Sequence, residues 1–428
     1  MTKPEAQDDW LPLDNAAKIY PSTASEKSPA EFRIFASMHQ PVRVHFLQKA
    51  LEHVLPRFPY FQVYLRRGFF WYYLQRNTVI PRIELMQNVP VGIISVKERT
   101  AAMIRVSARE NDIAVDFSHI LTDGNGGLRF FLTLLAEYIR LKGAEVSDHP
   151  NLMDLRQDPG TEEFEDAHRS SFFEAKSRDP EKLRPAYHVP GRPFRSKRYR
   201  LIRGSLPVDS VLATARKHGV TLTEYLAAVY MKSLIRIYKN EAEQGKKQRR
   251  SIIRMEIPVD MRRYYASVTM RNFSLFLSPE IDLSLGDYSF EELLRNIHHK
   301  VQLLRSKKQL QRQISRNVGA EFKPYVRFMP LFVKDLVLSS VHSRLGEQLH
   351  SGVISNLGKV DLPGEMLPYI ESLHFVLNPN HVMKKCCAVL SFKDKLQISF
   401  GSVIEDRSLE RLFFQHFIQE KIPVKIKE

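Results

Sequence analysis

The chain has 428 residues, of which 43% are hydrophobic and 26% are charged, a composition typical of a globular protein long enough for two cores. No window approaches the ~18 uninterrupted apolar residues of a membrane span, and the polar, acidic start is unlike a secretory signal, so we expect a cytoplasmic protein that is soluble or at most peripheral. The net charge of +16 attracts anionic partners, but no motif that reads nucleic acid accompanies it.

The first part of the chain alternates helix and strand signals. Residues 41–55 have apolar side chains at helical spacing, which predicts a helix. Residues 61–76 predict two strands joined by a turn at Arg67 and Gly68. This region is therefore expected to be mixed α and β.

Residues 102–119 predict two further strands around a Glu-Asn-Asp turn, and the second strand ends on a histidine. Ile113, Val115 and Phe117 share one face of that strand, and the two-residue period puts His119 on the same face. We therefore expect His119 to point inward. A lone inward histidine is usually a hydrogen-bonded core residue, so the neighbouring residues have to decide its role.

The twelve residues "DFSHILTDGNGG", 116–127, combine this histidine with an aspartate and three glycines. A plain strand-to-helix loop needs one or two turn formers, so the crowding indicates a site where the backbone comes close to another group. The glycines are expected to allow a sharp turn that holds His119 in an unusual conformation with open space beside it. An amphipathic helix then follows over residues 128–143.

Regular periodicity is lost between residue 144 and about residue 200, where an acidic stretch precedes a basic, proline-punctuated one. This interruption divides the chain into two halves of similar size. We therefore expect an N-terminal lobe over residues 1–175, a basic linker over 176–205 and a C-terminal lobe over 206–428.

The second half continues with strand and helix signals. Two helices are expected after the first strand, and the second of them begins at a capping box formed by Thr221 and Glu224. A long basic amphipathic helix is expected over about 289–318, with a further helix near 326–348. The expected strands of this half lie at 196–207, 251–262, 352–358, 370–377, 386–392 and 396–403.

The cysteines and the adjacent histidines favour neither a disulfide nor a metal site. Cys386 and Cys387 are the only cysteines, and as sequence neighbours they cannot easily bridge to each other, so we expect small buried residues in a strand. His298 and His299 face different ways on a helix, with no carboxylate at metal-ligand spacing. No metal and no permanently bound cofactor are expected.

His119, Asp123 and Gly124 form the pattern H-x-x-x-D-G. With this motif the sequence resembles the superfamily of coenzyme A-dependent acyltransferases, which includes chloramphenicol acetyltransferase, wax ester synthases and peptide synthetase condensation domains. A Pro-Val-Asp-x-Arg run followed by Asn-Phe within 257–279, and "ISNLG" at 354–358, are similar to second-half segments of these families. The alcohol acetyltransferase branch fits best, because "LPLDNAAKIYP" also resembles its opening segment.

The resemblance implies a two-lobed α/β sandwich with the active site in a tunnel between the lobes. It implies that His119 is the general base of a direct acyl transfer from acetyl-CoA, or another acyl-CoA, to a hydroxyl acceptor. The absence of a G-x-S-x-G elbow from the sequence agrees with a reaction that forms no acyl-enzyme. Asp123 is expected to form a structural ion pair with Arg262 and not to act as a relay to the imidazole.

The second lobe has to supply a donor for the oxyanion, and Ser355 and Asn356 are the candidates. Asn272 is a candidate for lining the acceptor or pantetheine channel. Two departures disfavour other branches of the superfamily. Ser118 stands where condensation domains and wax ester synthases usually have a second histidine, and the DFGWG motif of plant BAHD enzymes is missing.

Other functions stay open at this point. An acidic acyl carrier protein is an alternative donor that the basic surface would attract, and an amine is an alternative acceptor. A non-catalytic binding protein with the same fold is a third hypothesis, whereas nucleic-acid binding by charge alone is disfavoured. A site between two lobes of one chain requires no partner subunit, so a monomer is expected.

Overall fold

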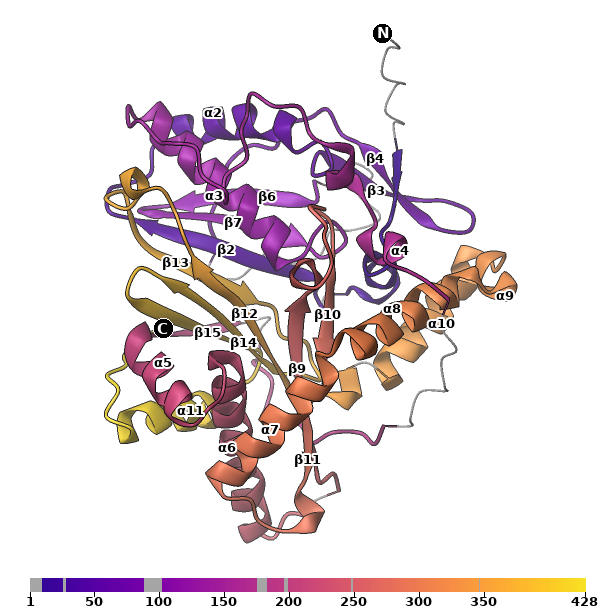
Figure 1. Cartoon of the computed structure of the whole chain (residues 1–428), viewed down its shortest axis with the longest axis vertical. Coiled ribbons are helices and arrows are strands. Elements are labelled where there is room, and N and C mark those ends of the chain that lie inside the picture. Colours follow the sequence, from indigo (N-terminus) through magenta and orange to yellow (C-terminus); the bar gives the residue numbers. More distant parts are fainter. Residues whose placement is uncertain are drawn as a thin grey trace.

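The computed structural model describes residues 10–25, 28–87, 102–174, 183–195, 199–247, 249–345 and 347–428. The chain forms two lobes, each built on a β-sheet with helices packed against it (Figure 1). Part of the predicted basic linker, residues 176–182 and 196–198, lies outside the described residues.

The sheet of the N-terminal lobe has five strands in the order β13-β2-β7-β6-β5. Helices α2 (Val44–Val54) and α3 (Gly124–Leu141) cover it (Figure 1), and the predicted helices are confirmed. A smaller sheet at the side has the order β1-β4-β3, with the predicted strand pair around Gly68. The strands of both sheets are β1 (Trp10–Pro12), β2 (Glu31–Met38), β3 (Val63–Arg67), β4 (Tyr72–Arg76), β5 (Glu84–Leu85), β6 (Ile104–Arg109), β7 (Asp112–Ser118) and β13 (Ile370–Leu377).

The sheet of the C-terminal lobe has the order β10-β9-β12-β14-β15-β8-β16, and β11 also pairs with β9. Its strands are β8 (Arg200–Pro207), β9 (Ile252–Asp260), β10 (Ser274–Leu277), β11 (Glu280–Asp282), β12 (Gly352–Val360), β14 (Lys385–Phe392), β15 (Lys395–Ser402) and β16 (Lys425–Lys427). Helices α5 (Val208–Lys217), α6 (Leu222–Glu243) and α11 (Ser408–Gln419) belong to this lobe. The predicted capping box opens α6, where the Thr221 hydroxyl accepts from the Glu224 N–H at 3.3 Å.

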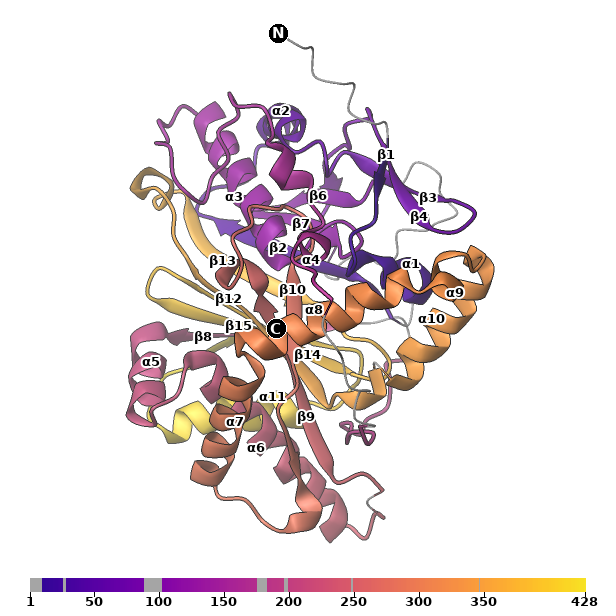
Figure 2. The same cartoon turned by 45° about the vertical axis from the view of Figure 1, so that its right-hand side comes forward.

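The long helix predicted over 289–318 is wrong in one respect, because the structure divides it. It consists of α7 (Phe290–Leu304) and α8 (Lys307–Phe322), which run in different directions (Figure 2). Ser306 separates them with an extended backbone, ψ 141°, at the N-cap position that serine favours. The helix predicted near 326–348 likewise becomes a short α9 (Pro324–Arg327) and α10 (Leu331–Leu345).

One strand of the second half, β13, completes the sheet of the N-terminal lobe. It pairs antiparallel with β2, with Phe375 opposite Ile34 and Leu373 opposite Ala36. All four side chains are buried. The core of the N-terminal lobe is therefore built from both ends of the chain, which a division of the sequence at the linker does not show.

Two further expectations concern buried and membrane-spanning segments. Cys386 and Cys387 are buried thiols in β14, as predicted. Within the described residues, no helix combines the length and the apolar content that crossing a lipid bilayer requires.

Candidate active site

His119 lies directly after β7, at the point where the chain leaves the sheet and turns towards α3. Its backbone N–H donates to the carbonyl of Ala30 at 2.8 Å, which extends the pairing of β2 and β7 by one residue. The Ser118 hydroxyl accepts from the Ile120 N–H at 3.2 Å and closes the turn. The histidine backbone is therefore held by the sheet on one side and by the turn on the other.

The imidazole of His119 lies against two aromatic rings. The Tyr20 ring stacks on it with a centroid distance of 5.3 Å and an interplanar angle of 15°, and the centroid of Phe32 lies 4.7 Å away. Burial lowers the pKa of His119 to about 4, although the charge of Asp123 and a hydrogen bond with the Thr122 backbone act in the opposite direction. The imidazole is therefore neutral near pH 7, which is the form that accepts a proton.

The Asp123 carboxylate is engaged by four donors, none of which belongs to His119. It is the N-cap of α3, where one oxygen accepts from the N–H groups of Asn125 at 3.2 Å and Gly126 at 3.1 Å. The other oxygen accepts from the Phe273 N–H at 2.8 Å and from the Arg262 guanidinium at 2.9 Å. Burial alone would raise the pKa of Asp123, but Arg262 and the hydrogen bonds lower it below its usual value.

The predicted Asp123–Arg262 ion pair is thus present, and Arg262 does more than neutralise the aspartate. It follows β9, and the same guanidinium nitrogen that contacts Asp123 also contacts Asp260 at 3.0 Å. Its other nitrogens donate to the carbonyls of Thr269 at 3.0 Å and Arg271 at 2.7 Å. Arg262 therefore ties the loop before β10 to the start of α3.

The glycines after Asp123 have a different role from the one expected. Gly124, Gly126 and Gly127 lie inside α3. None of them has a positive φ, so the sharp turn that was expected here is absent. A Cβ atom at Gly126 would lie 2.5 Å from the carbonyl oxygen of Met270, and one at Gly127 would lie 2.9 Å from the Phe32 ring. The glycines therefore allow other segments to pack closely against the first turn of the helix.

Asn272 is 2% exposed, and its side-chain amide holds the backbone of the histidine. The amide donates to the His119 carbonyl at 2.9 Å and to the Asp14 carboxylate at 3.1 Å. Asp14 in turn accepts from the Ala17 N–H at 2.8 Å, which anchors the short helix leading into Tyr20. The contacts of Asn272 thus join the N-terminal segment, the histidine and the second lobe.

The two predicted oxyanion donors lie on β12 and face opposite sides of the sheet. Ser355 pairs with Ala388 and Asn356 with Val389. Ala388 belongs to the core of the N-terminal lobe and Val389 to that of the C-terminal lobe, so Ser355 faces the side of His119.

The Asn356 side chain is already engaged on the other side of the sheet. Its amide donates to the Thr223 hydroxyl of α6 at 3.1 Å, and its carbonyl accepts from the Gly358 N–H at 2.8 Å. A register shift between Asn356 and Lys359 marks a bulge here. Leu357, within the bulge, reaches the start of α3, where a Cβ atom at Gly124 would lie 2.7 Å from its side chain.

Solved structures with a similar overall fold identify the architecture of the chain. The Fusarium sporotrichioides TRI101 protein, solved with coenzyme A and T-2, matches with a TM-score of 0.62 at 13% identity, covering 97% of this chain and 99% of its own. The trichothecene 15-O-acetyltransferase TRI3 of the same fungus matches with a TM-score of 0.57 at 12% identity, covering 95% and 93%. The wax ester synthase/diacylglycerol acyltransferase of Marinobacter aquaeolei matches with a TM-score of 0.56 at 13% identity, covering 96% and 100%.

The chain has the fold of the coenzyme A-dependent acyltransferases and condensation domains. The predicted two-lobed α/β architecture is therefore confirmed. In sequence, no protein-family model and no curated protein matches the chain.

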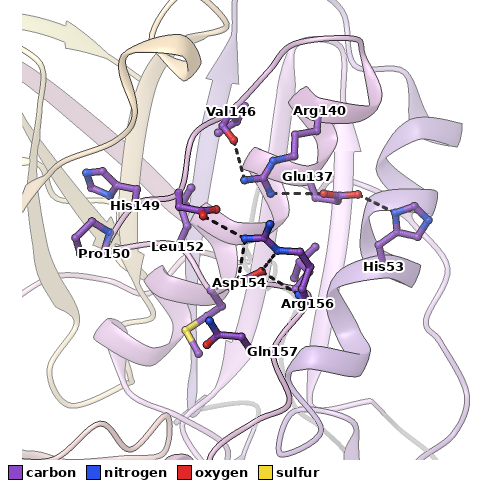
Figure 3. A pocket seen from close by; sticks show the side chains of 13 residues that line it. His53, Glu137, Arg140, Val146, His149, Pro150, Leu152, Asp154, Arg156 and Gln157 are labelled. Atoms are coloured by element: carbon purple, nitrogen blue, oxygen red, sulfur yellow. Dashed lines mark hydrogen bonds and ion pairs between the residues drawn. The ribbon is translucent and has the colours of Figure 1, made fainter.

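A groove elsewhere on this acyltransferase fold is a separate feature. It has a volume of about 890 Å³ and lies along the second half of α3, against α2 and the loop that follows α3 (Figure 3). Its charged side chains pair with one another. Glu137 contacts His53 at 2.8 Å, and Arg156 contacts Asp154 at 2.8 Å. The groove contains none of the predicted site residues and presents no unpaired group that could act on a substrate.

Sequence reasoning missed three residues of the site. Tyr20 and Phe32 contact the imidazole, and Asp14 holds Asn272. Tyr20 and Asp14 stand in the segment "LPLDNAAKIYP", so the resemblance of that segment was the available signal. Burial, followed by the nearby acids, raises the pKa of Tyr20 and keeps its phenol protonated.

Proposed function

We propose that this protein is an acyl-CoA-dependent O-acyltransferase in which His119 is the general base, and that an alcohol is the acceptor. The observation that carries the proposal is a neutral imidazole whose backbone is held from both lobes, by Ala30 directly before β2 and by Asn272 before β10. His119 is half-buried, which supports space beside it for substrates.

In the proposed reaction, acyl-CoA and the acceptor reach His119 from opposite sides of a tunnel between the lobes. The imidazole takes the proton of the acceptor hydroxyl as the oxygen attacks the thioester carbonyl. A C–O bond forms, and the carbonyl becomes a tetrahedral oxyanion. The C–S bond then breaks, and the imidazolium returns the proton to the thiolate of coenzyme A.

The proposal gives the other site residues supporting roles. Ser355 faces the core on the side of His119, so its hydroxyl is the better candidate donor to the oxyanion, while the Asn356 amide already bonds to Thr223. The Asn272 side chain contacts the His119 backbone, and the side chains of Asp123 and Arg262 contact each other. These three residues are therefore positioning residues.

The comparisons support acyl-CoA as co-substrate. The TRI101 structure contains coenzyme A, and a starter condensation domain of rhizomide synthetase was solved with C8-CoA. Condensation domains share this fold, and a donor bound to a carrier protein is accordingly the second candidate. An acidic carrier protein would be attracted by the net charge of +16.

The test is release of free thiol from acetyl-CoA and longer acyl-CoAs across a panel of alcohols and amines. Acceptor-dependent release should fall by about 10²- to 10⁴-fold in His119→Gln, the usual contribution of a general base. His53→Gln is the matched control, because it makes the same substitution at a histidine that pairs with Glu137 in the groove of Figure 3. Circular dichroism establishes that both variants are folded.

Full activity in His119→Gln, or an equal loss in His53→Gln, would contradict the assignment of the site. Transfer from an acylated carrier protein with no transfer from free acyl-CoA would select the second candidate. Silence with both donors would leave a binding protein with this fold as the better hypothesis.

A further inference from the structure

An apolar surface lies away from the His119 site, where the turn between β3 and β4 meets α9 and α10 (Figure 1). The backbone N–H of Leu331 donates to the carbonyl of Phe69 at 2.9 Å and joins the two segments. We call the exposed side chains here the aromatic patch. Its members are Phe69, Phe70, Tyr325, Phe328, Phe332 and Leu336, with exposed fractions from 39% at Phe70 to 73% at Phe69.

On helix α10, two charged side chains point inward and two large apolar side chains point outward, while Leu331 at its start is buried in the core. Lys334 is 3% exposed, and its ammonium group donates to the Phe70 carbonyl at 2.8 Å. Asp335 also turns inward and accepts from the Ser22 hydroxyl at 2.7 Å. Phe332 and Leu336 are 62% and 70% exposed. Surface helices normally bury the apolar face, so this arrangement indicates that the outer face is made to contact something apolar.

The exposed charges of this region are positive. In residues 322–340, all of which are described, the exposed charged side chains are Lys323 and Arg327. They lie over the rings of Tyr325 and Phe328, with charge-to-centroid distances of 5.9 Å each. Arg67, at the end of β3, is paired with Asp335 at 3.2 Å and is not counted among these charges. Aromatic side chains interleaved with basic ones are typical of surfaces that lie at an anionic lipid interface.

We propose that the aromatic patch docks this protein on an anionic membrane surface. The aromatic and aliphatic side chains enter the boundary between headgroups and acyl chains, and Lys323 and Arg327 contact lipid phosphates. A lipid surface is favoured over a second copy of the chain because the net charge of +16 repels a copy and attracts anionic lipid. An acidic protein would satisfy the charges but would leave the outward aromatic side chains needing a matching pocket.

The patch is held in a fixed position relative to His119. Helix α1 (Tyr20–Thr23) lies between them, since Ser22 bonds to Asp335 of α10 and Tyr20 stacks on the imidazole. Lys334 also lies 3.5 Å from the Trp71 ring centroid, which fixes α10 to the β3–β4 turn. Docking itself does not depend on the proposed catalytic activity, so it is measured without a substrate.

The test is flotation of the full chain with vesicles of phosphatidylcholine mixed with phosphatidylserine, and with vesicles of phosphatidylcholine alone. The wild-type protein should float with the mixed vesicles and much less with the neutral ones. Replacing Phe328, Phe332 and Leu336 together by Ser should reduce partitioning by on the order of 100-fold, from the apolar area that no longer enters the lipid. Lys323→Glu with Arg327→Glu should reduce binding to the mixed vesicles selectively.

The matched control replaces two exposed leucines outside the patch, Leu285 and Leu303, which are 80% and 63% exposed, by Ser. This control should float like the wild type. The proposal is overturned if the triple Ser variant floats as well as the wild type. It is also overturned if the wild type does not float and the triple Ser variant only abolishes self-association in sedimentation, because the patch is then an interface between copies.

Discussion

Replacing Arg262 by Leu tests whether its guanidinium supports the active site in addition to stabilising the fold. Asp123 is 4% exposed, and Arg262→Leu would leave its carboxylate buried without a cation. Breaking a buried ion pair on one side costs about 3–5 kcal/mol. Three backbone N–H groups still donate to Asp123, so we expect the lower end, about 3 kcal/mol.

Activity should fall as well, because Arg262 holds the loop that carries Asn272 and thereby the His119 carbonyl. A displacement of about 1 Å at the reacting group costs about 10²-fold in rate. The control is Lys385→Met, which breaks the buried Lys385–Glu410 pair in the C-terminal lobe and should lower stability without lowering the rate of folded protein.

Urea unfolding followed by circular dichroism gives the stability of each variant, and thiol release at saturating acyl-CoA gives its rate. Because the pKa of Asp123 is lowered on folding, its contribution in the wild type is present above the unfolded carboxyl pKa of about 3.9 and is lost only below it. In Arg262→Leu, burial is no longer opposed by the guanidinium, so the Asp123 pKa rises and the stability difference from wild type should be largest at pH 7 and should shrink as the pH falls. An Arg262→Leu variant with wild-type midpoint and rate would refute the reasoning.

Three further outcomes follow from the site and the core. Because the pKa of His119 falls from about 6.5 unfolded to about 4 folded, the wild type should lose about 2 kcal/mol of stability between pH 7 and pH 5 that His119→Gln does not lose, measured by urea titration at each pH. Gly126→Ala should destabilise by about 1–3 kcal/mol, because its Cβ atom meets the Met270 carbonyl, and an unshifted thermal midpoint would contradict this. Burial raises the pKa of both thiols at Cys386 and Cys387, so an aromatic disulfide reagent should react with them only after unfolding in urea, and prompt labelling of the native protein would count against their burial.

The sequence by itself determined the local structure and the main features of the site. The helical spacing in 41–55 and the alternation that leads to His119 predicted α2 and β7, because the period of apolar residues is a local property. The H-x-x-x-D-G pattern and the family resemblance that it carries predicted the two-lobed acyltransferase fold correctly. The Asp123–Arg262 pair followed from the resemblance as well.

Tertiary structure alone decided how distant segments meet. The break at Ser306 separates α7, which packs against α6, from α8, which packs against α4 (Ala167–Ser170), although the apolar residues of 289–318 are spaced as in one helix. Two contacts of the histidine come from Tyr20, 99 positions earlier, and from Asn272, 153 positions later. No local period encodes such contacts, because they arise only when β13 closes the N-terminal sheet and the second lobe is brought against α3.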